Sequence, residues 1–335
     1  MQGSGNHQPE FVVLLLLLFV VGFGTIAQRL KTPYPVVLVI GGLLLSVIPG
    51  LPHVSLNPDL IFLVLLPPLL FSAAFNTSWR DFRCNLTSIL LLAFGLVAFT
   101  TLGVGLTAHW LIPAFDWRPG DGPRCCDLPD DAIAATAIAK RLRLPEHIVD
   151  ILEGESLVND ASGLLALEFA VTMVVSGHVP SAPEAVWRLA YLTTAGIATG
   201  LVLGKVVYVF EKRIDDPPIE ITASIVVPYF AYAGGEAIHA SGVLSAVACG
   251  LYLGWRSSVY FSSTARLQSW ATWNTFTFIL NGMAFLLIGL QLHGVISGIQ
   301  SVSVEALAFS ATILVSVVIL LRLAGFIQER TCHSC

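Results

Sequence analysis

Charged residues are scarce in this sequence. Asp, Glu, Lys and Arg together make up 12% of the 335 residues, whereas hydrophobic residues make up 55%. A soluble domain of this size normally carries about a quarter charged residues. The composition therefore excludes an ordinary soluble protein.

The sequence also lacks a basic N-terminal segment and any recognisable cysteine motif. The first ten residues, MQGSGNHQPE, contain no Lys or Arg and so lack the basic segment that opens a signal peptide. We therefore expect the apolar run that follows to be a true first membrane helix. The six cysteines show no spacing typical of a disulfide framework or a zinc site, so neither is expected.

Long apolar runs recur along the chain, each near the ~20 residues that a helical span of the bilayer needs. We predict an all-α, multi-pass membrane protein. The predicted spans are 11–28, 35–52, 59–75, 86–113, 147–176, 187–210, 219–238, 241–254, 271–292 and 305–324. The run at 241–254 is short, and we expect a broken or tilted helix there.

The basic residues gather in five of the connecting loops, which hold 11 of the 17 Lys and Arg residues. They are Arg29, Lys31, Arg80, Arg83, Lys140, Arg141, Arg143, Lys212, Arg213, Arg256 and Arg266. Because basic loops face the cytoplasm, we predict a plasma-membrane protein with its N-terminus outside. This alternation requires a crossing between about 114 and 140. The apolar run 132–139 covers only ~12 Å of a ~30 Å core, so that crossing is incomplete as written.

The segment 151–175, ILEGESLVNDASGLLALEFAVTMVV, concentrates polar side chains in a helix that otherwise fits the membrane. Glu155 and Asn159 are four residues apart and share one helix face, as do Ser156 and Asp160. Ionisable side chains in the hydrocarbon region are costly and usually mark an ion or proton path. A polar cluster that only packs helices together is the alternative.

A buried carboxylate favours its protonated form, because desolvation penalises the charged form. If the same carboxylate also binds a dehydrated monovalent cation, proton and cation compete for one site. Exposing that site to each side of the membrane in turn then exchanges one for the other. Asp160 is our candidate for this carboxylate, with Asn159 and Ser156 supplying neutral oxygens.

The sequence resembles the monovalent cation:proton antiporter-1 family, bacterial relatives of the eukaryotic sodium/hydrogen exchangers. The element GESLVND at 154–160 is the most specific part of the resemblance. The matching stretches are 62–82 (FLVLLPPLLFSAAFNTSWRDF), 131–171, 227–254 (VPYFAYAGGEAIHASGVLSAVACGLYLG) and 278–292 (FILNGMAFLLIGLQL).

This resemblance implies an inverted-repeat fold with two discontinuous helices that cross near an ion site at the membrane midplane. It implies cation and proton binding by Asp160, Asn159, Ser156 and Asp131, and a buried ion pair for Glu155. The implied cargo is sodium, lithium or potassium exchanged for protons, for pH and sodium homeostasis. No cofactor, resident metal or nucleic-acid partner is expected; membrane lipid and a second copy of the chain, as a homodimer, are.

Two stretches depart from the family pattern. Family members have a stretch similar to LGAVISPTDAIAA. In this chain its second part is intact, as DAIAATAIA from Asp131 onward, but the residues before it, 120–130, are GDGPRCCDLPD. Codons that encode residues 120–131 can be chosen so that a one-nucleotide shift of the reading frame gives Leu-Gly-Ala-Val-Ile-Ser-Pro-Thr before Asp131. We therefore predict that this stretch is out of frame. The codons of residues 325–335, GFIQERTCHSC, can likewise be shifted into a sequence typical of the family, so we predict that this tail is also out of frame. We thus expect an exchanger domain over 1–324 that is C-terminally incomplete.

Three other interpretations stay open. The chain is an inactive, truncated remnant of an antiporter; or Cys125 and Cys126 form a metal or redox site; or the protein is an intramembrane hydrolase. Adjacent cysteines chelate one tetrahedral ion poorly, and no His–Cys cluster accompanies them. A hydrolase requires a base near Ser156, and GESLVND is not a nucleophile elbow. We therefore predict a transporter and not an enzyme.

Overall fold

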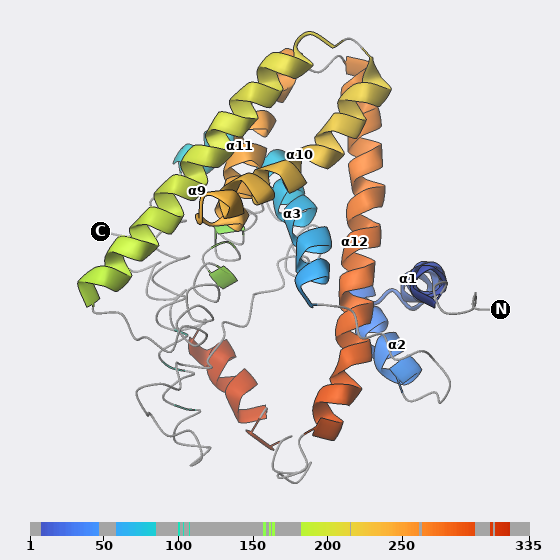
Figure 1. The fold of residues 1–335 in the computed structure, drawn as a ribbon. Coiled ribbons are helices and arrows are strands. Elements are labelled where there is room, and N and C mark those ends of the chain that lie inside the picture. The colour runs from blue at the N-terminus through green and yellow to red at the C-terminus, as the bar shows by residue number, and fades with distance from the viewer. Residues whose placement is uncertain are drawn as a thin grey trace, which may run out of the picture. The chain divides into compact units, whose positions relative to one another are not determined.

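The structure is a computed structural model. It describes residues 8–46, 58–84, 182–214, 216–260, 263–298 and 312–321, with positions 100, 103, 107, 157–158, 161, 163–164 and 309–310. The main elements are α1 (Gln8–Leu30), α2 (Tyr34–Ser46), α3 (Pro58–Asn76), α4 (Trp79–Cys84), α9 (Ala182–Glu211), α10 (Pro217–Ala237), α11 (Gly242–Tyr260) and α12 (Ser263–Gly298) (Figure 1). Every element in these ranges is a helix, so the all-α class is confirmed there.

Most predicted spans correspond to one helix. The runs 11–28, 59–75 and 187–210 lie inside α1, α3 and α9, and the run 219–238 extends one residue beyond the end of α10. The expectation of a short, broken or tilted helix at 241–254 was wrong in its extent, because α11 runs unbroken from Gly242 to Tyr260. Its last turns, WRSSVY, are polar, so hydropathy alone ended the span too early. Most of the run 86–113 and most of the run 147–176 lie outside the described residues.

Local chemistry explains where several helices begin and end. Pro217 occupies the first position of α10, where its missing N–H costs nothing, and the Asp216 carbonyl accepts from Glu220 N–H at 3.1 Å. Ser241 precedes α11, and its Oγ lies 3.5 Å from the Leu244 amide nitrogen that donates to it. The first cap thus marks the start of α10, and the second marks the tight connection between α10 and α11.

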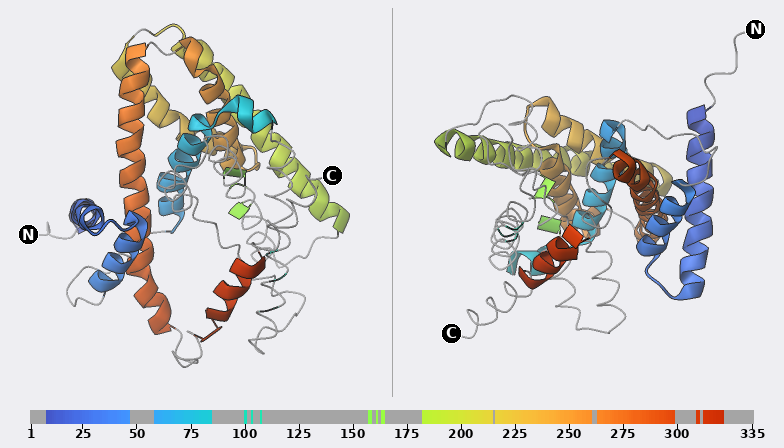
Figure 2. Two further views of the ribbon diagram at one scale, coloured as in Figure 1. Left: turned by 180° about the vertical axis from the view of Figure 1, so that it is seen from behind. Right: turned by 90° about the horizontal axis from the view of Figure 1, so that it is seen from below.

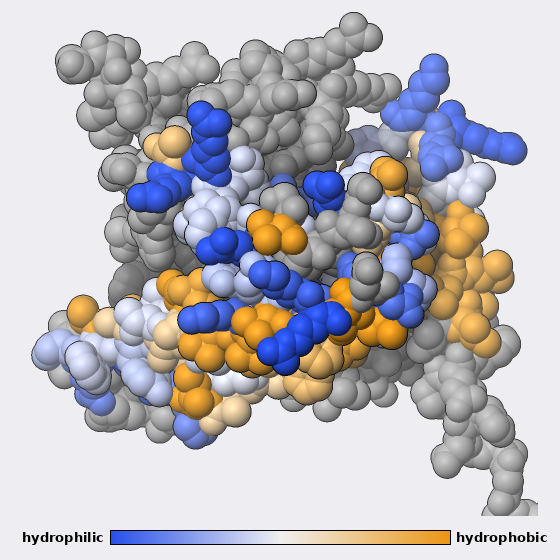
Figure 3. Space-filling view, turned by 90° about the horizontal axis from the view of Figure 1, so that it is seen from above, coloured by the Kyte–Doolittle hydropathy of each residue, from blue (hydrophilic) through white to orange (hydrophobic). Residues whose placement is uncertain are grey.

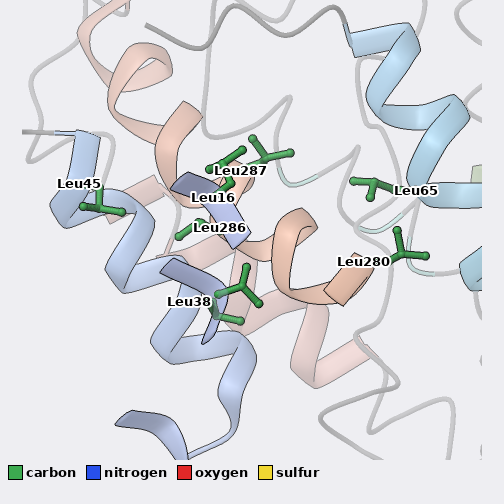
Figure 4. Close-up of a cluster of buried hydrophobic side chains, with 8 residues drawn as sticks. Leu16, Leu38, Leu45, Leu65, Leu280, Leu286 and Leu287 are labelled. Carbon is green, nitrogen blue, oxygen red and sulfur yellow. The ribbon is translucent and has the colours of Figure 1, made fainter. Parts of the chain in front are cut away.

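The chain divides into two compact units, and α3, α9, α10 and α11 each contribute residues to both. In the first unit, α1 and α2 pack beside α12 (Figures 1 and 2). Gly42 and Gly289 allow the close approach of α2 to α12: a Cβ on Gly42 would collide with the Leu286 carbonyl, and one on Gly289 with the Val39 carbonyl. Around this crossing lies a cluster of buried side chains (Figure 4). Its members are Leu16, Val20, Leu38, Leu45, Leu65, Leu280, Leu286 and Leu287.

In the second unit, α9 packs closely on α11. Gly196, Gly200 and Gly204 recur every four residues and form one stripe of α9. A Cβ on Gly196 would lie 2.8 Å from the Ser241 carbonyl oxygen, and one on Gly200 would overlap the Ser245 carbonyl. Small residues at this spacing are typical of membrane helices whose backbones touch.

The remaining faces suit a hydrocarbon environment. Two helical segments, Pro183–Glu211 and Thr264–Leu292, are long and apolar enough to cross a bilayer. On α9, large apolar side chains such as Val202, Val206 and Phe210 are exposed opposite the glycine stripe. Seen from above, hydrophilic and hydrophobic residues lie side by side among the coloured residues (Figure 3).

Candidate functional site

All five residues assigned to the site from the sequence, namely Asp131, Glu155, Ser156, Asn159 and Asp160, lie outside the described residues. Their roles therefore remain predictions. The described positions interleaved with them are Leu157, Val158, Ala161, Gly163 and Leu164, and all five are helical.

The neighbours Leu157 and Ala161 show how deep this segment lies. Leu157 is 2% exposed and Ala161, four residues later, is 1% exposed. Residues four apart share a helix face, so one face here is fully covered by protein.

A second buried polar group lies in the first unit, where α9 ends and α10 begins. Glu211 is 1% exposed and Glu220 is 2% exposed, although both belong to the sequence EKRIDDPPIE that reads as a surface loop. Carboxylates are rarely buried to this degree unless they have partners. The sequence analysis missed these two residues, since nothing in a charged loop distinguishes a buried Glu from an exposed one.

Aromatic and hydroxyl side chains link three helices of the first unit. Trp273 of α12 donates its Nε1–H to the Ser224 Oγ of α10 at 3.1 Å, and the Trp273 ring stacks on Phe71 of α3 with centroids 5.7 Å apart. Ser224 Oγ in turn donates to the Ile221 carbonyl at 2.7 Å. These contacts join α3, α10 and α12 within the first unit.

The contact between Arg256 and Tyr208 bears on the predicted topology. The Arg256 guanidinium carbon lies 5.8 Å from the centroid of the Tyr208 ring, so the C-terminal ends of α9 and α11 are neighbours. Alternating crossings require these two ends to lie on one side of the membrane. The structure places Arg256 in the last turns of α11 and Arg266 in the first turn of α12, so the expectation that both lie in a connecting loop was wrong. At the opposite end of α9, Tyr191 donates to the Ile238 carbonyl at 2.9 Å, in a connection that has no Lys or Arg.

Comparison with known proteins identifies the family. A model of the sodium/hydrogen exchanger transmembrane family matches residues 14–333, which is nearly the whole chain. The chain belongs to the sodium/hydrogen exchanger family. The resemblance drawn from GESLVND and its companion stretches is thereby confirmed at the level of the family.

Relatives of this exchanger-family chain include two with named activities. It is 35% identical over 294 residues to a "Sodium, potassium, lithium and rubidium/H(+) antiporter" of Bacillus pumilus, covering 85% of this chain and 44% of that protein. It is 29% identical over 297 residues to the "Low-affinity Na(+)/H(+) antiporter NhaS1" of Synechocystis, covering 86% of this chain and 55% of that one. The chain thus spans about half the length of these curated relatives.

A solved structure shares the fold of this exchanger-family chain. The sodium proton antiporter MjNhaP1 of Methanocaldococcus jannaschii matches with a TM-score of 0.63 at 19% identity, over 83% of this chain and 68% of that one. The similarity confirms the all-helical antiporter fold predicted from the sequence. The inverted repeat and the two discontinuous helices remain predictions.

Proposed function

We propose that this protein exchanges sodium, or another monovalent cation, for protons across the plasma membrane. The observation that carries the proposal is the element GESLVND within a chain that belongs to the sodium/hydrogen exchanger family over residues 14–333. Relatives at 35% and 29% identity are named as antiporters of monovalent cations and protons. Exchange of this kind serves pH and sodium homeostasis.

In this mechanism Asp160 holds either a proton or a cation, never both. Burial favours the protonated carboxyl, and a dehydrated cation offsets the same desolvation by direct coordination. Asn159 and Ser156 supply neutral oxygens to the cation and orient the carboxylate. On each side of the membrane the bound proton or cation must leave Asp160 before the other can bind. The flux of protons is therefore coupled to the flux of cations in the opposite direction.

Two further carboxylates have supporting roles in the proposal. Glu155 forms a buried ion pair, because a second buried negative charge beside Asp160 requires a cationic partner. Asp131 contributes to the cation path from the segment DAIAATAIA. Neither role requires a cofactor, and the protein acts as a transporter and not as an intramembrane hydrolase.

The proposed setting is a multi-pass homodimer in the plasma membrane, with its N-terminus outside. The neighbouring ends of α9 and α11 support this orientation, since Arg256 of α11 lies beside Tyr208 near the end of α9, which the basic residues Lys212 and Arg213 follow. Basic residues favour the cytoplasmic side.

The experiment uses everted membrane vesicles from cells that lack endogenous sodium/proton antiporters. Vesicles containing the chain are acidified by respiration, and sodium is then added while a pH-sensitive dye is followed. Sodium should release protons, and Asp160→Asn should remove that response. Glu184→Gln, which changes an exposed carboxylate at the start of α9, is the matched control and should leave it intact.

A second candidate is an inactive remnant, favoured by the stretch GDGPRCCDLPD at 120–130. This stretch stands where the family has an apolar, proline-broken crossing, and we infer that it and 325–335 are out of frame. Resequencing the DNA across codons 115–135 and from codon 320 onward decides between the candidates. Missing or extra bases that restore Pro-Thr before Asp131 favour an active antiporter, and an unchanged frame favours the remnant.

A further inference from the structure

Two of the described helices, α3 and α10, carry prolines in their interior. Pro67 and Pro68 lie within α3, and Pro228 lies within α10; all three side chains are fully buried. Proline has no N–H, so each one leaves the carbonyl four residues earlier without its helical partner. In α3 the carbonyls released in this way are those of Leu63 and Val64.

A tyrosine from the other proline-containing helix meets one of these carbonyls. The Tyr229 hydroxyl of α10, directly after Pro228, donates to the Val64 carbonyl oxygen at 3.1 Å, across 165 residues of sequence. Val64 is the residue whose carbonyl would accept the amide that Pro68 lacks. Its side chain is 46% exposed, so this part of α3 lies near the surface of the protein. In a bilayer such a surface offers no water to satisfy a backbone carbonyl.

The surrounding contacts place this bond at a junction. One turn from the prolines, Trp273 joins α3 and α10 by stacking on Phe71 and donating to Ser224. Val64, Phe71, Ser224, Tyr229 and Trp273 all belong to the first unit. The bond from Tyr229 to Val64 thus joins the proline-containing segments of α3 and α10 within this unit.

We propose that Tyr229 is a positioning residue whose hydroxyl replaces the amide lost at Pro68 and fixes this turn of α3 against α10. The Val64 carbonyl then has a specific donor in place of the missing helical one. Through this bond Tyr229 sets the position of the turn of α3 that follows Pro68, which carries the buried Ser72. The role goes beyond ion exchange and does not depend on whether the chain transports.

A double-mutant cycle on the full chain tests the role. In Tyr229→Phe only the hydroxyl is removed, and the folding equilibrium constant, measured by SDS unfolding in mixed micelles, should fall about threefold, as for typical hydrogen bonds between membrane helices. In Pro68→Ala the amide is restored and Val64 regains its helical partner. Tyr229→Phe should therefore change the equilibrium constant little in the Pro68→Ala background.

Two controls make the result specific. Pro67→Ala restores the partner of Leu63 and not of Val64, so the threefold effect of Tyr229→Phe should persist in it. Tyr191→Phe removes another hydroxyl bonded to a carbonyl, that of Ile238, and its effect should be the same with and without Pro68. If Pro68→Ala does not accumulate, Pro68→Leu restores the same amide. An equal loss from Tyr229→Phe in the presence and absence of Pro68 would overturn the proposal.

Discussion

His239 adopts a left-handed backbone conformation where α10 ends, with φ of 55°. Its N–H donates to the Glu236 carbonyl at 2.9 Å, and the Ala240 N–H donates to the Gly235 carbonyl at 3.0 Å. Together these bonds form a Schellman motif, which usually has glycine at the left-handed position. A side chain there costs about 1 kcal/mol relative to glycine.

His239→Gly should therefore raise the free energy of unfolding by up to about 1 kcal/mol, reduced by the greater chain entropy of glycine in the unfolded state. The measurement is SDS unfolding in mixed micelles. His239→Val places a β-branched side chain in the same conformation and should destabilise the protein. A His239→Gly variant less stable than the His239→Val variant would show that the turn is not held in this conformation.

Some of the residues that matter for function or structure can be recognised from the sequence, and others cannot. Glu155, Ser156, Asn159 and Asp160 stand out because polar side chains in an apolar run are costly. Pro67 and Pro68 lack the N–H that a helix interior normally uses, which is evident from the sequence. The donor that serves the Val64 carbonyl could not be foreseen, because Tyr229 lies 165 residues from Val64 and only tertiary packing brings the two together.

Among the elements, the contact of α9 with α11 depends on the absence of side chains. Gly200 faces the Ser245 carbonyl, which is backbone and cannot rotate away. Ser245 is fixed further, since its Oγ donates to the Ala231 carbonyl of α10 at 2.6 Å. A side chain at position 200 would force the two helices apart and weaken packing over several turns.

Gly200→Val should lower the free energy of unfolding by about 3 kcal/mol, the upper part of the usual range for overpacked positions. Folded yield and SDS unfolding in mixed micelles report the change. Gly22→Val is the matched control, because a Cβ at Gly22 meets nothing within 4 Å and this variant should stay near the original stability. Equal effects at the two positions would contradict the packing described for α9 and α11.

The ends of a helix could be predicted only where the apolar run and the helix begin and end at nearly the same residues. For α3 the predicted run 59–75 differs from the observed helix by one residue at each end. For α12 the predicted run 271–292 falls well short of Ser263–Gly298, because the first turns, STARLQSW, are polar. Hydropathy reports the part of a helix that suits hydrocarbon, whereas backbone hydrogen bonds continue into the polar ends.

For the whole molecule, composition and motif were sufficient to identify the class. The scarcity of charge predicted a membrane protein, and GESLVND predicted the sodium/hydrogen exchanger family, which the match over residues 14–333 confirms. The buried carboxylates Glu211 and Glu220 could not be recognised in this way. Their burial follows from the arrangement of whole helices and not from their neighbours in sequence.

The central claim is that one carboxylate, Asp160, binds either a proton or a cation. The most direct measurement is the sodium concentration that gives half-maximal proton release from everted vesicles, determined across a range of pH. Competition at one carboxylate predicts that this concentration rises about tenfold for each pH unit below the pH at which the site is half protonated. A half-maximal concentration that stays constant with pH while only the maximal rate changes, or no sodium-dependent release at all, would contradict the account.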